Sequence, residues 1–299
     1  MFIDIHAHAY RRPVPFVVQF CSAEELVARY DAEGIEKGAV LPIVSPEIYL
    51  PQANEDILDM AEQYPGRLIP FCNIDPRALT NSADAPLDRL LRYYRDKGCK
   101  GVGEIMPNMP MMDPRVQNLF KHAEAVGLPV TCDGSDTVGG DFGLYDDPGL
   151  PQLEHTLQRF PKLIMLAHGP LFWAEIGRLD TPGQRKPPFR PDGQQAPSWP
   201  QSGPIKEEGV APKLLRRYPN LYGELSDATA ALARDPGYGP KFLTEFQDRM
   251  LFGTDICFKD MPFHTKALLL QWRAEGKISE TVFRKIAREN AIKLFGLSG

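Results

Sequence analysis

The sequence predicts an α/β protein whose eight parallel strands close into a (β/α)8 barrel, the TIM-barrel fold. Eight apolar segments of strand length recur along the 299 residues, and amphipathic helical segments separate them. Strands alternating with helices are typical of parallel βαβ units, and eight such units favour a closed barrel over an open sheet. We therefore expect one barrel domain over residues 1–299. The expected strands are 2–8, 38–44, 67–74, 100–105, 128–134, 162–168, 220–226 and 249–255.

The helical segments carry apolar residues at three- and four-residue spacing, and several have end signals. Ser22 with Glu25 predicts a capping box, and Asp113 before Pro114 predicts an N-cap with proline at the first helical position. Proline cannot continue a helix, so an aromatic–proline pair before a strand should end one. Such pairs stand at 64–65, 160–161 and 218–219.

Residues 181–204 interrupt this pattern with seven prolines and three glycines. The stretch lies between the sixth and seventh expected strands, where a loop of a barrel overhangs the active face. Long irregular loops are usually functional or disordered. This proline-rich insertion could form a lid or a wall of the substrate site. It could equally be a solvated arm or an arm that contacts another subunit.

Composition excludes several classes of function. The net charge of −5 and the lack of a basic tract argue against a nucleic-acid partner. No apolar run approaches the ~20 residues of a membrane span, and the first residues lack the features of a signal peptide. Five widely spaced cysteines without a CxxC pair indicate reduced thiols. We expect a cytoplasmic protein that acts on a small molecule.

Polar residues gather at the ends of the expected strands. His6 and His8 are two residues apart, so in a regular strand they share one face. The carboxyl ends of barrel strands meet at one mouth, which is where such enzymes have their active sites. Histidines and carboxylates that meet there can hold a divalent ion with a position left for water. The other strand-end residues of these types are Glu104, Asp133, His168, Glu224, Asp227 and Asp255.

Three motifs carry a resemblance to a known family. HAH at 6–8, LAHG at 166–169 and LFGTD at 251–255, in this order, resemble the amidohydrolase superfamily. The chain is most similar to its amidohydrolase-related branch, which includes aminocarboxymuconate semialdehyde decarboxylase. The resemblance runs to the closing segment ARENAIKLFGL at 287–297. It implies a metal-dependent enzyme and, as a family-level expectation, a homodimer.

The resemblance also implies residue roles. His6 and His8 would bind the metal, and Asp255 would both bind the metal and shuttle a proton. His168 would bind a second metal or polarise the substrate. Asp133 stands where the branch usually has a histidine ligand, and Glu104 resembles the bridging ligand of two-metal members. The expected cofactor is Zn²⁺, with Mn²⁺ as an alternative, at one or two ions per chain.

Such a site can catalyse either of two reactions. A bound divalent ion lowers the pKa of its water towards ~7, so Asp255 could accept the water's proton while His168 stabilises the oxyanion. The result would be hydrolysis of an amide, ester or lactone. The alternative reaction is decarboxylation of an aromatic or unsaturated acid. A more remote alternative is that the barrel is inactive and serves only for binding.

Three further residues are candidates for substrate contact. Arg11 follows the first strand and could meet an anionic substrate, although a plain surface charge is equally open. Trp173 lies five residues after His168 and could form an apolar wall or pack in the core. His264 follows the eighth strand on the active side, where a loop or helix-start position is the alternative.

Overall fold

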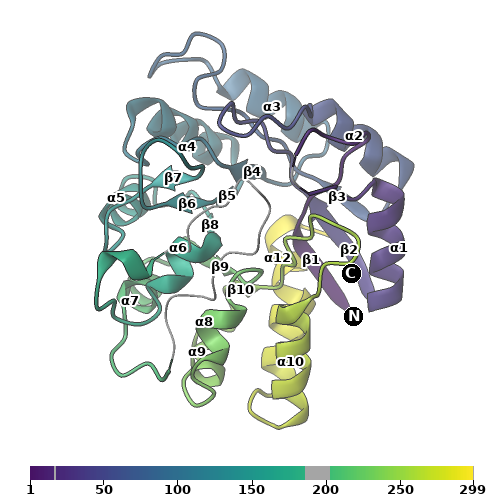
Figure 1. Ribbon diagram of the computed structural model, residues 1–299. Coiled ribbons are helices and arrows are strands. Elements are labelled where there is room, and N and C mark those ends of the chain that lie inside the picture. Colours follow the sequence, from purple (N-terminus) through teal and green to yellow (C-terminus); the bar gives the residue numbers. More distant parts are fainter. Residues whose placement is uncertain (17, 186–202, 299) are drawn as a thin grey trace.

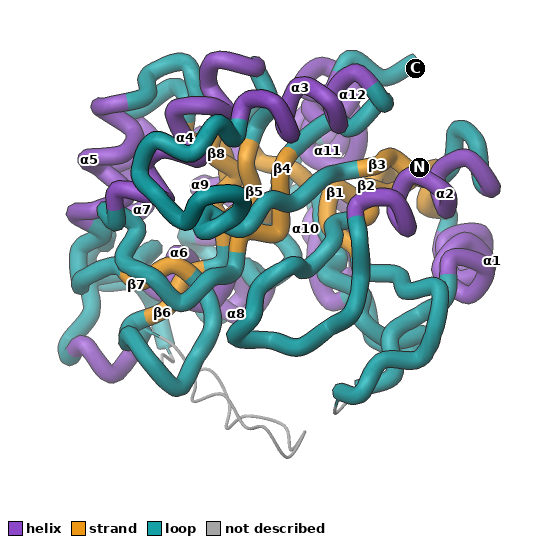
Figure 2. The backbone as a smooth tube through the Cα atoms, turned by 90° about the horizontal axis from the view of Figure 1, so that it is seen from above, coloured by secondary structure: helices purple, strands orange, loops and turns teal. Residues whose placement is uncertain are grey.

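Eight parallel strands form the centre of the protein, and helices surround them (Figures 1 and 2). The computed structural model describes residues 1–16, 18–185 and 203–298. Each expected strand segment contains a strand, although the second begins at Ile35 rather than at residue 38. The barrel strands are β1 (Phe2–Ala7), β2 (Ile35–Val40), β3 (Leu68–Pro70), β4 (Val102–Ile105), β5 (Val130–Cys132), β8 (Met165–Ala167), β9 (Leu221–Glu224) and β10 (Met250–Leu251).

The strands follow chain order around the barrel. One sheet has the order β1-β2-β3 and another the order β10-β9-β8-β5-β4. Single parallel bridges join the two sheets, between Cys72 and Val102 and between Ala7 and Ile256. At the second junction the Asp255 amide donates to the His6 carbonyl over 2.8 Å. The first strand is therefore bonded directly to the loop that follows the last strand.

The helices lie where the sequence predicts them, and their caps are confirmed. Ser22 and Glu25 form the capping box of α1, and the Asp113 side chain accepts from the Arg115 amide at the start of α4. Within the described ranges no helix is long and apolar enough to cross a membrane. The helices are α1 (Ala23–Glu33), α2 (Asn54–Gln63), α3 (Asp88–Asp96), α4 (Pro114–Val126), α5 (Pro151–Arg159), α6 (Gly169–Ala174), α7 (Val210–Arg217), α8 (Thr229–Ala233), α9 (Gly239–Glu245), α10 (His264–Ala274), α11 (Glu280–Arg284) and α12 (Asn290–Phe295), with a 3-10 helix at Pro182–Gln184 and a π-helix at Lys285–Glu289.

The aromatic–proline pairs end three of these helices as predicted. Tyr64, Phe160 and Tyr218 are the C-cap residues of α2, α5 and α7. A ribbon of β6 (Gly134–Ser135) and β7 (Leu144–Tyr145) follows β5 and was not predicted, since strands of two residues leave no periodicity. Most of the proline-rich insertion lies outside the described residues, so its two interpretations stay open.

Strand β1 does not keep the strict alternation that the sequence suggests. Ile3 and Ile5 belong to an apolar cluster that includes Phe295 of α12, whereas Phe2 and Ala7 belong to the larger cluster under the surrounding helices. Regular alternation would put Ala7 with Ile5. The β1–β2 register shifts between Asp4 and Ala7, and this irregularity changes the face of the residues after it. Although they are two positions apart, Asp4 and His6 therefore do not share a face.

Candidate metal centre

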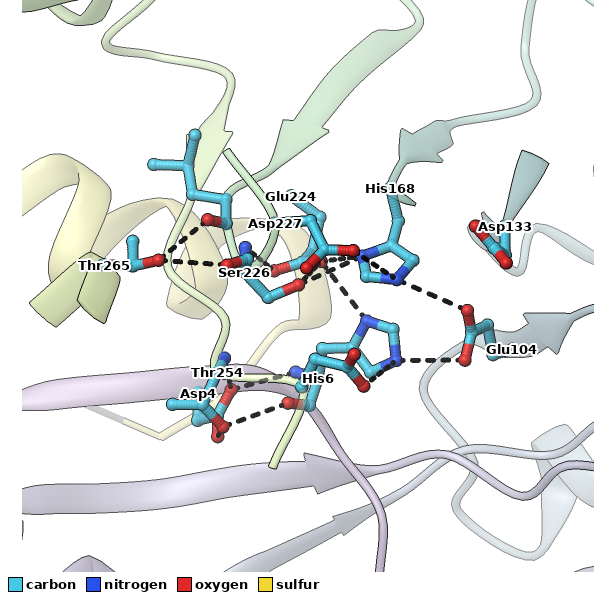
Figure 3. A network of polar contacts seen from close by, with 12 residues as sticks. Asp4, His6, Glu104, Asp133, His168, Glu224, Ser226, Asp227, Thr254 and Thr265 are labelled. Atoms are coloured by element: carbon cyan, nitrogen blue, oxygen red, sulfur yellow. Dashed lines mark hydrogen bonds and ion pairs between the residues drawn. The ribbon is translucent and has the colours of Figure 1, made fainter. Parts of the chain in front are cut away.

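Histidines and carboxylates from four strands converge at the carboxyl end of the barrel (Figure 3). His6 and His8 come from the end of β1, Glu104 from β4 and His168 from the residue after β8. Asp255 comes from the loop after β10, and 24% of its side chain is exposed. The other four side chains are buried. The sequence thus predicted the residues of the central cluster.

Four donor atoms face one point between these side chains. His6 Nε2 lies 3.2 Å from His8 Nε2, 3.3 Å from Glu104 Oε2 and 3.5 Å from Asp255 Oδ1. His8 Nε2 lies 3.3 Å from the same Glu104 oxygen and 3.2 Å from the same Asp255 oxygen. Donors about 2.1 Å from one ion in tetrahedral geometry would stand ~3.4 Å apart. The spacing of the four atoms fits that of a single divalent ion's ligands.

The other oxygen of Glu104 faces a different partner. Glu104 Oε1 lies 3.4 Å from His168 Nε2, and that nitrogen lies 3.9 Å from Asp227 Oδ2. His6, Glu104, His168 and Asp255 each offer a ligand atom, and these atoms all lie within 4.8 Å of one another. Glu104 is therefore placed between the four-donor group and a second group around His168, as the predicted bridging role requires.

Glu224, the last residue of β9, contacts the Nδ1 atoms of two of the histidines. Its Oε2 lies 3.2 Å from His6 Nδ1 and 2.6 Å from His168 Nδ1. Ser226 holds Glu224 in turn, because its hydroxyl donates to Oε2 and its amide donates to Oε1. His8 Nδ1 donates to the Leu41 carbonyl over 2.9 Å. Each Nδ1 thus has an acceptor behind it, which leaves each Nε2 facing the site.

Glu224 is the functional residue that sequence reasoning did not put in the site. Its position at the end of the seventh expected strand was a signal, but several strand-end residues share that signal. Only the three-dimensional arrangement shows that one buried oxygen contacts two histidines.

The charges of the site perturb the pKa values of its members. Burial disfavours the His6 cation, but Asp255 and Glu104 outweigh it and raise the pKa of His6 well above its ordinary value. Burial and His6 both oppose the charge on His168, yet Glu224 and Glu104 raise the pKa of His168 to about 10. Burial, partly offset by His168, raises the pKa of Asp227 to about 7. The carboxylates therefore demand a compensating positive charge, which protons or a metal ion can supply.

Two glycines of the sequence motifs leave room for site carboxylates. Gly253 of LFGTD lies against Glu224 and His6, and a Cβ there would collide with the Glu224 carboxylate. Gly169 of LAHG has a φ of 86°, and a Cβ there would collide with the Asp133 carboxylate. The motifs thus combine candidate ligands with space for the carboxylates that lie beside them.

Gly253→Ala should therefore displace Glu224 and weaken metal binding about tenfold, the lower end of the effect expected for a lost supporting contact. Competition with a chelating dye measures the affinity for Zn²⁺. Gly183→Ala is the matched control, because a Cβ at Gly183 meets open space. Equal affinities in the two variants would contradict this role of Gly253.

The loop that carries Asp255 is fixed by buried hydrogen bonds. Thr254 donates from its hydroxyl to Asp4 Oδ2 over 2.6 Å and from its amide to Asp4 Oδ1 over 2.9 Å. Tyr30 of α1 donates to the same carboxylate over 2.8 Å. Asp255 itself has a φ of 50°, in the left-handed region that side-chain-bearing residues rarely adopt. These bonds hold Asp255 in a conformation that the chain alone disfavours.

A cavity of about 220 Å³ opens beside the cluster. His8, Glu104, His168 and Asp255 lie in its wall, together with Asp133 and Asp227 and a set of apolar side chains. A substrate bound in this cavity would contact the candidate metal ligands directly.

Comparison with known proteins identifies the family. The amidohydrolase family model matches residues 3–297. The chain belongs to the amidohydrolase family. This membership confirms the resemblance carried by the three motifs and agrees with the barrel fold.

Several solved structures share the fold of this amidohydrolase. An uncharacterised TIM-barrel protein from Bordetella bronchiseptica is 18% identical, with a TM-score of 0.64 over 99% of this chain and 98% of the other. A probable 2-pyrone-4,6-dicarboxylic acid hydrolase from Acinetobacter baumannii is 13% identical, with a TM-score of 0.60 over 99% of each chain. A 2,6-dihydroxybenzoate decarboxylase from Rhizobium is 15% identical, with a TM-score of 0.59 over 100% of this chain and 99% of the other. No curated protein matches the sequence.

Asp133, predicted as a metal ligand, lines the cavity of this amidohydrolase beside the cluster. Its Oδ1 accepts from the Gly134 amide over 2.8 Å, and it is not among the residues whose ligand atoms lie within 4.8 Å of one another in the described chain. The structure thus places Asp133 next to the four-donor group, and a role as ligand stays a prediction.

The three predicted substrate contacts lie away from the cavity. Trp173 is fully buried and donates from Nε1 to the Glu224 carbonyl, so it supports β9 and cannot form the predicted wall. Arg11 is exposed and paired with Asp56 and Asp59 of α2. His264 is exposed at the start of α10 and lines a separate cavity. Trp173 thus packs in the core instead of lining the cavity, and Arg11 pairs with the carboxylates of α2 instead of facing a substrate.

Proposed function

We propose that this protein is a metal-dependent hydrolase that cleaves an ester, lactone or amide bond of a small molecule. One observation carries the proposal: two imidazole nitrogens lie 3.2 Å apart, and each lies 3.2–3.5 Å from the same two carboxylate oxygens. Because Glu224 and the Leu41 carbonyl occupy the Nδ1 atoms, the lone pairs of His6 Nε2 and His8 Nε2 face this point. Buried acceptors so arranged need a cation between them.

The donor set suits a borderline or hard divalent ion. Two imidazole nitrogens with two carboxylate oxygens are compatible with Zn²⁺ and with Mn²⁺, and His6, His8, Glu104 and Asp255 would hold it. Glu104 Oε1 and His168 Nε2 would contribute to a second ion. A divalent ion held there supplies water whose pKa is lowered towards ~7, and hence a nucleophile at neutral pH.

The chain's own residues would then move the protons. Asp255, the most exposed member of the cluster, accepts a proton from the attacking water and returns it to the leaving group. Where only the first ion is bound, Glu224 and Glu104 keep His168 cationic, and His168 donates from Nε2 to the oxygen on which negative charge develops. Ser226 and Glu224 hold the His168 ring in place for that donation.

Hydrolysis is favoured over the decarboxylase alternative by the charge of the cavity. Glu104, Asp133, Asp227 and Asp255 all line it, and a substrate carboxylate would meet them. The inactive-barrel alternative would leave buried carboxylates and histidines together without a use, which costs stability. A reaction on a neutral acyl group suits this site better.

The first test is metal content and metal dependence. We expect at least one equivalent of zinc or manganese per chain by elemental analysis, and loss of at least half of it in Glu104→Ala. Chelation should abolish hydrolysis of neutral aryl esters, and added metal should restore it. Glu175→Gln is the control, since Glu175 is buried but contacts Arg185 and the Gly149 amide rather than the cluster. Full activity in metal-free protein would overturn the proposal.

A further inference from the structure

The cavity beside the cluster has two chemically different sides. The apolar part of the lining comes from loops that follow β1, β2 and β4, from the connection between β6 and β7, and from the start of α6. Two of its aromatic rings contact each other, with Phe16 and Phe20 at 6.1 Å between centroids, and Phe20 also contacts His8 at 6.2 Å. The apolar lining residues are Phe16, Phe20, Ile43, Ile48, Leu50, Met106, Phe142 and Pro170.

The polar side of the cavity carries an excess of negative charge. Glu104, Asp133, Asp227 and Asp255 line it, and Glu224 lies directly behind His168. Five carboxylates carry more negative charge than one divalent ion and a cationic His168 would together neutralise. Even an occupied centre would therefore repel a second anionic group on the substrate.

Apart from His168, no cationic side chain lines the cavity within the part of the chain that the structure describes. Neither lysine nor arginine lines the cavity there. Arg11 is paired with Asp56 and Asp59, and Arg77 is paired with Glu47 and Asp75. An anionic group in this cavity would lose its water without gaining a lysine or arginine as partner.

We infer that the substrate is an uncharged ester, lactone or amide with an aliphatic or aromatic body. The scissile carbonyl lies at the His8, Glu104 and Asp255 side, and the apolar body lies against Phe20, Leu50 and the other apolar lining residues. This inference rests on the proposed function and adds the substrate class to it. It excludes carboxylate-bearing substrates, including the aromatic acids that a decarboxylase would take.

A pair of anilides that differ in one terminal group tests the inference by binding. Butyranilide is neutral, and succinanilic acid has a carboxylate in place of the terminal methyl group. Titration calorimetry on zinc-loaded protein should give butyranilide the lower Kd by at least tenfold. Equal or tighter binding of the acid overturns the inference, and so does the absence of binding by both compounds.

A charge introduced into the apolar side should reverse the preference. Phe142→Arg places a cation in the lining, so the ratio of the two Kd values should shift at least fivefold towards the acid. Phe142→Leu is the matched control and should keep the preference for butyranilide. A shift of equal size in both variants would contradict the electrostatic argument.

Aniline release in the same samples separates the inference from the proposed function. Preferential binding of butyranilide together with no hydrolysis of it or of neutral aryl esters would support the substrate class and refute the hydrolase. Hydrolysis with preference for the acid would do the reverse. Both proposals can therefore fail independently.

Discussion

Asp255→Asn should lower kcat for hydrolysis of a neutral aryl ester by at least a thousandfold. Asp255 is the only carboxylate of the four-donor group with 24% of its side chain exposed, and so the one that can reach both water and substrate. Its removal takes away a proton acceptor and one anionic donor. A positioned acid or base contributes typically 10²–10⁴-fold, and loss of a ligand adds to this. Steady-state kinetics at saturating Zn²⁺ measures the effect.

The control for this variant lies on the same segment of the chain. Asp260→Asn removes an exposed carboxylate five residues away, so its kcat should stay within twofold of the parent protein. Elemental analysis of both variants shows whether the ion is still bound. If Asp255→Asn keeps metal and more than a tenth of the activity, another residue moves the proton.

Glu224→Gln should weaken Zn²⁺ binding 10–100-fold and lower kcat/KM by about 100-fold, although Glu224 would not touch the ion. One Glu224 oxygen accepts from both His6 and His168, and an amide cannot accept from both as strongly. Supporting hydrogen bonds behind metal-binding histidines have effects of this size. A chelator-competition titration gives the affinity, and kinetics on a neutral aryl ester gives kcat/KM.

A second buried glutamate provides the matched control. Glu175 is equally buried but contacts Arg185 and the Gly149 amide, away from the cluster. Glu175→Gln should lower Tm without changing the affinity for Zn²⁺. If Glu224→Gln also changes only Tm, then Glu224 has a structural role and does not position the histidines.

The parts of the fold that depend on local chemistry were predictable from the sequence. The capping box at Ser22, the N-cap at Asp113 and the helix ends at Tyr64, Phe160 and Tyr218 each rest on neighbouring residues, and all are confirmed. The strands were predictable because apolar runs mark buried parallel strands. The short β6 and β7 and the irregularity in β1 depend on tertiary pairing, which no local pattern encodes.

The candidate site was predictable where position along a strand decides it. His6, His8, Glu104, His168 and Asp255 all lie at strand ends, and a barrel brings strand ends together. Residues beyond the strand ends were not predictable in the same way. Trp173 and Arg11 follow their strands closely, but side-chain direction and local ion pairs turned them away from the cavity.

The junction between β1 and the loop after β10 bears on how the protein matures during synthesis. His6 and His8 are synthesised almost 250 residues before Asp255. At about 5–20 residues per second, the histidines wait for many seconds before their last partner exists. A nascent chain that lacks β10 therefore has no complete four-donor group, so we expect any ion held by this group to be acquired only after β10 has been translated.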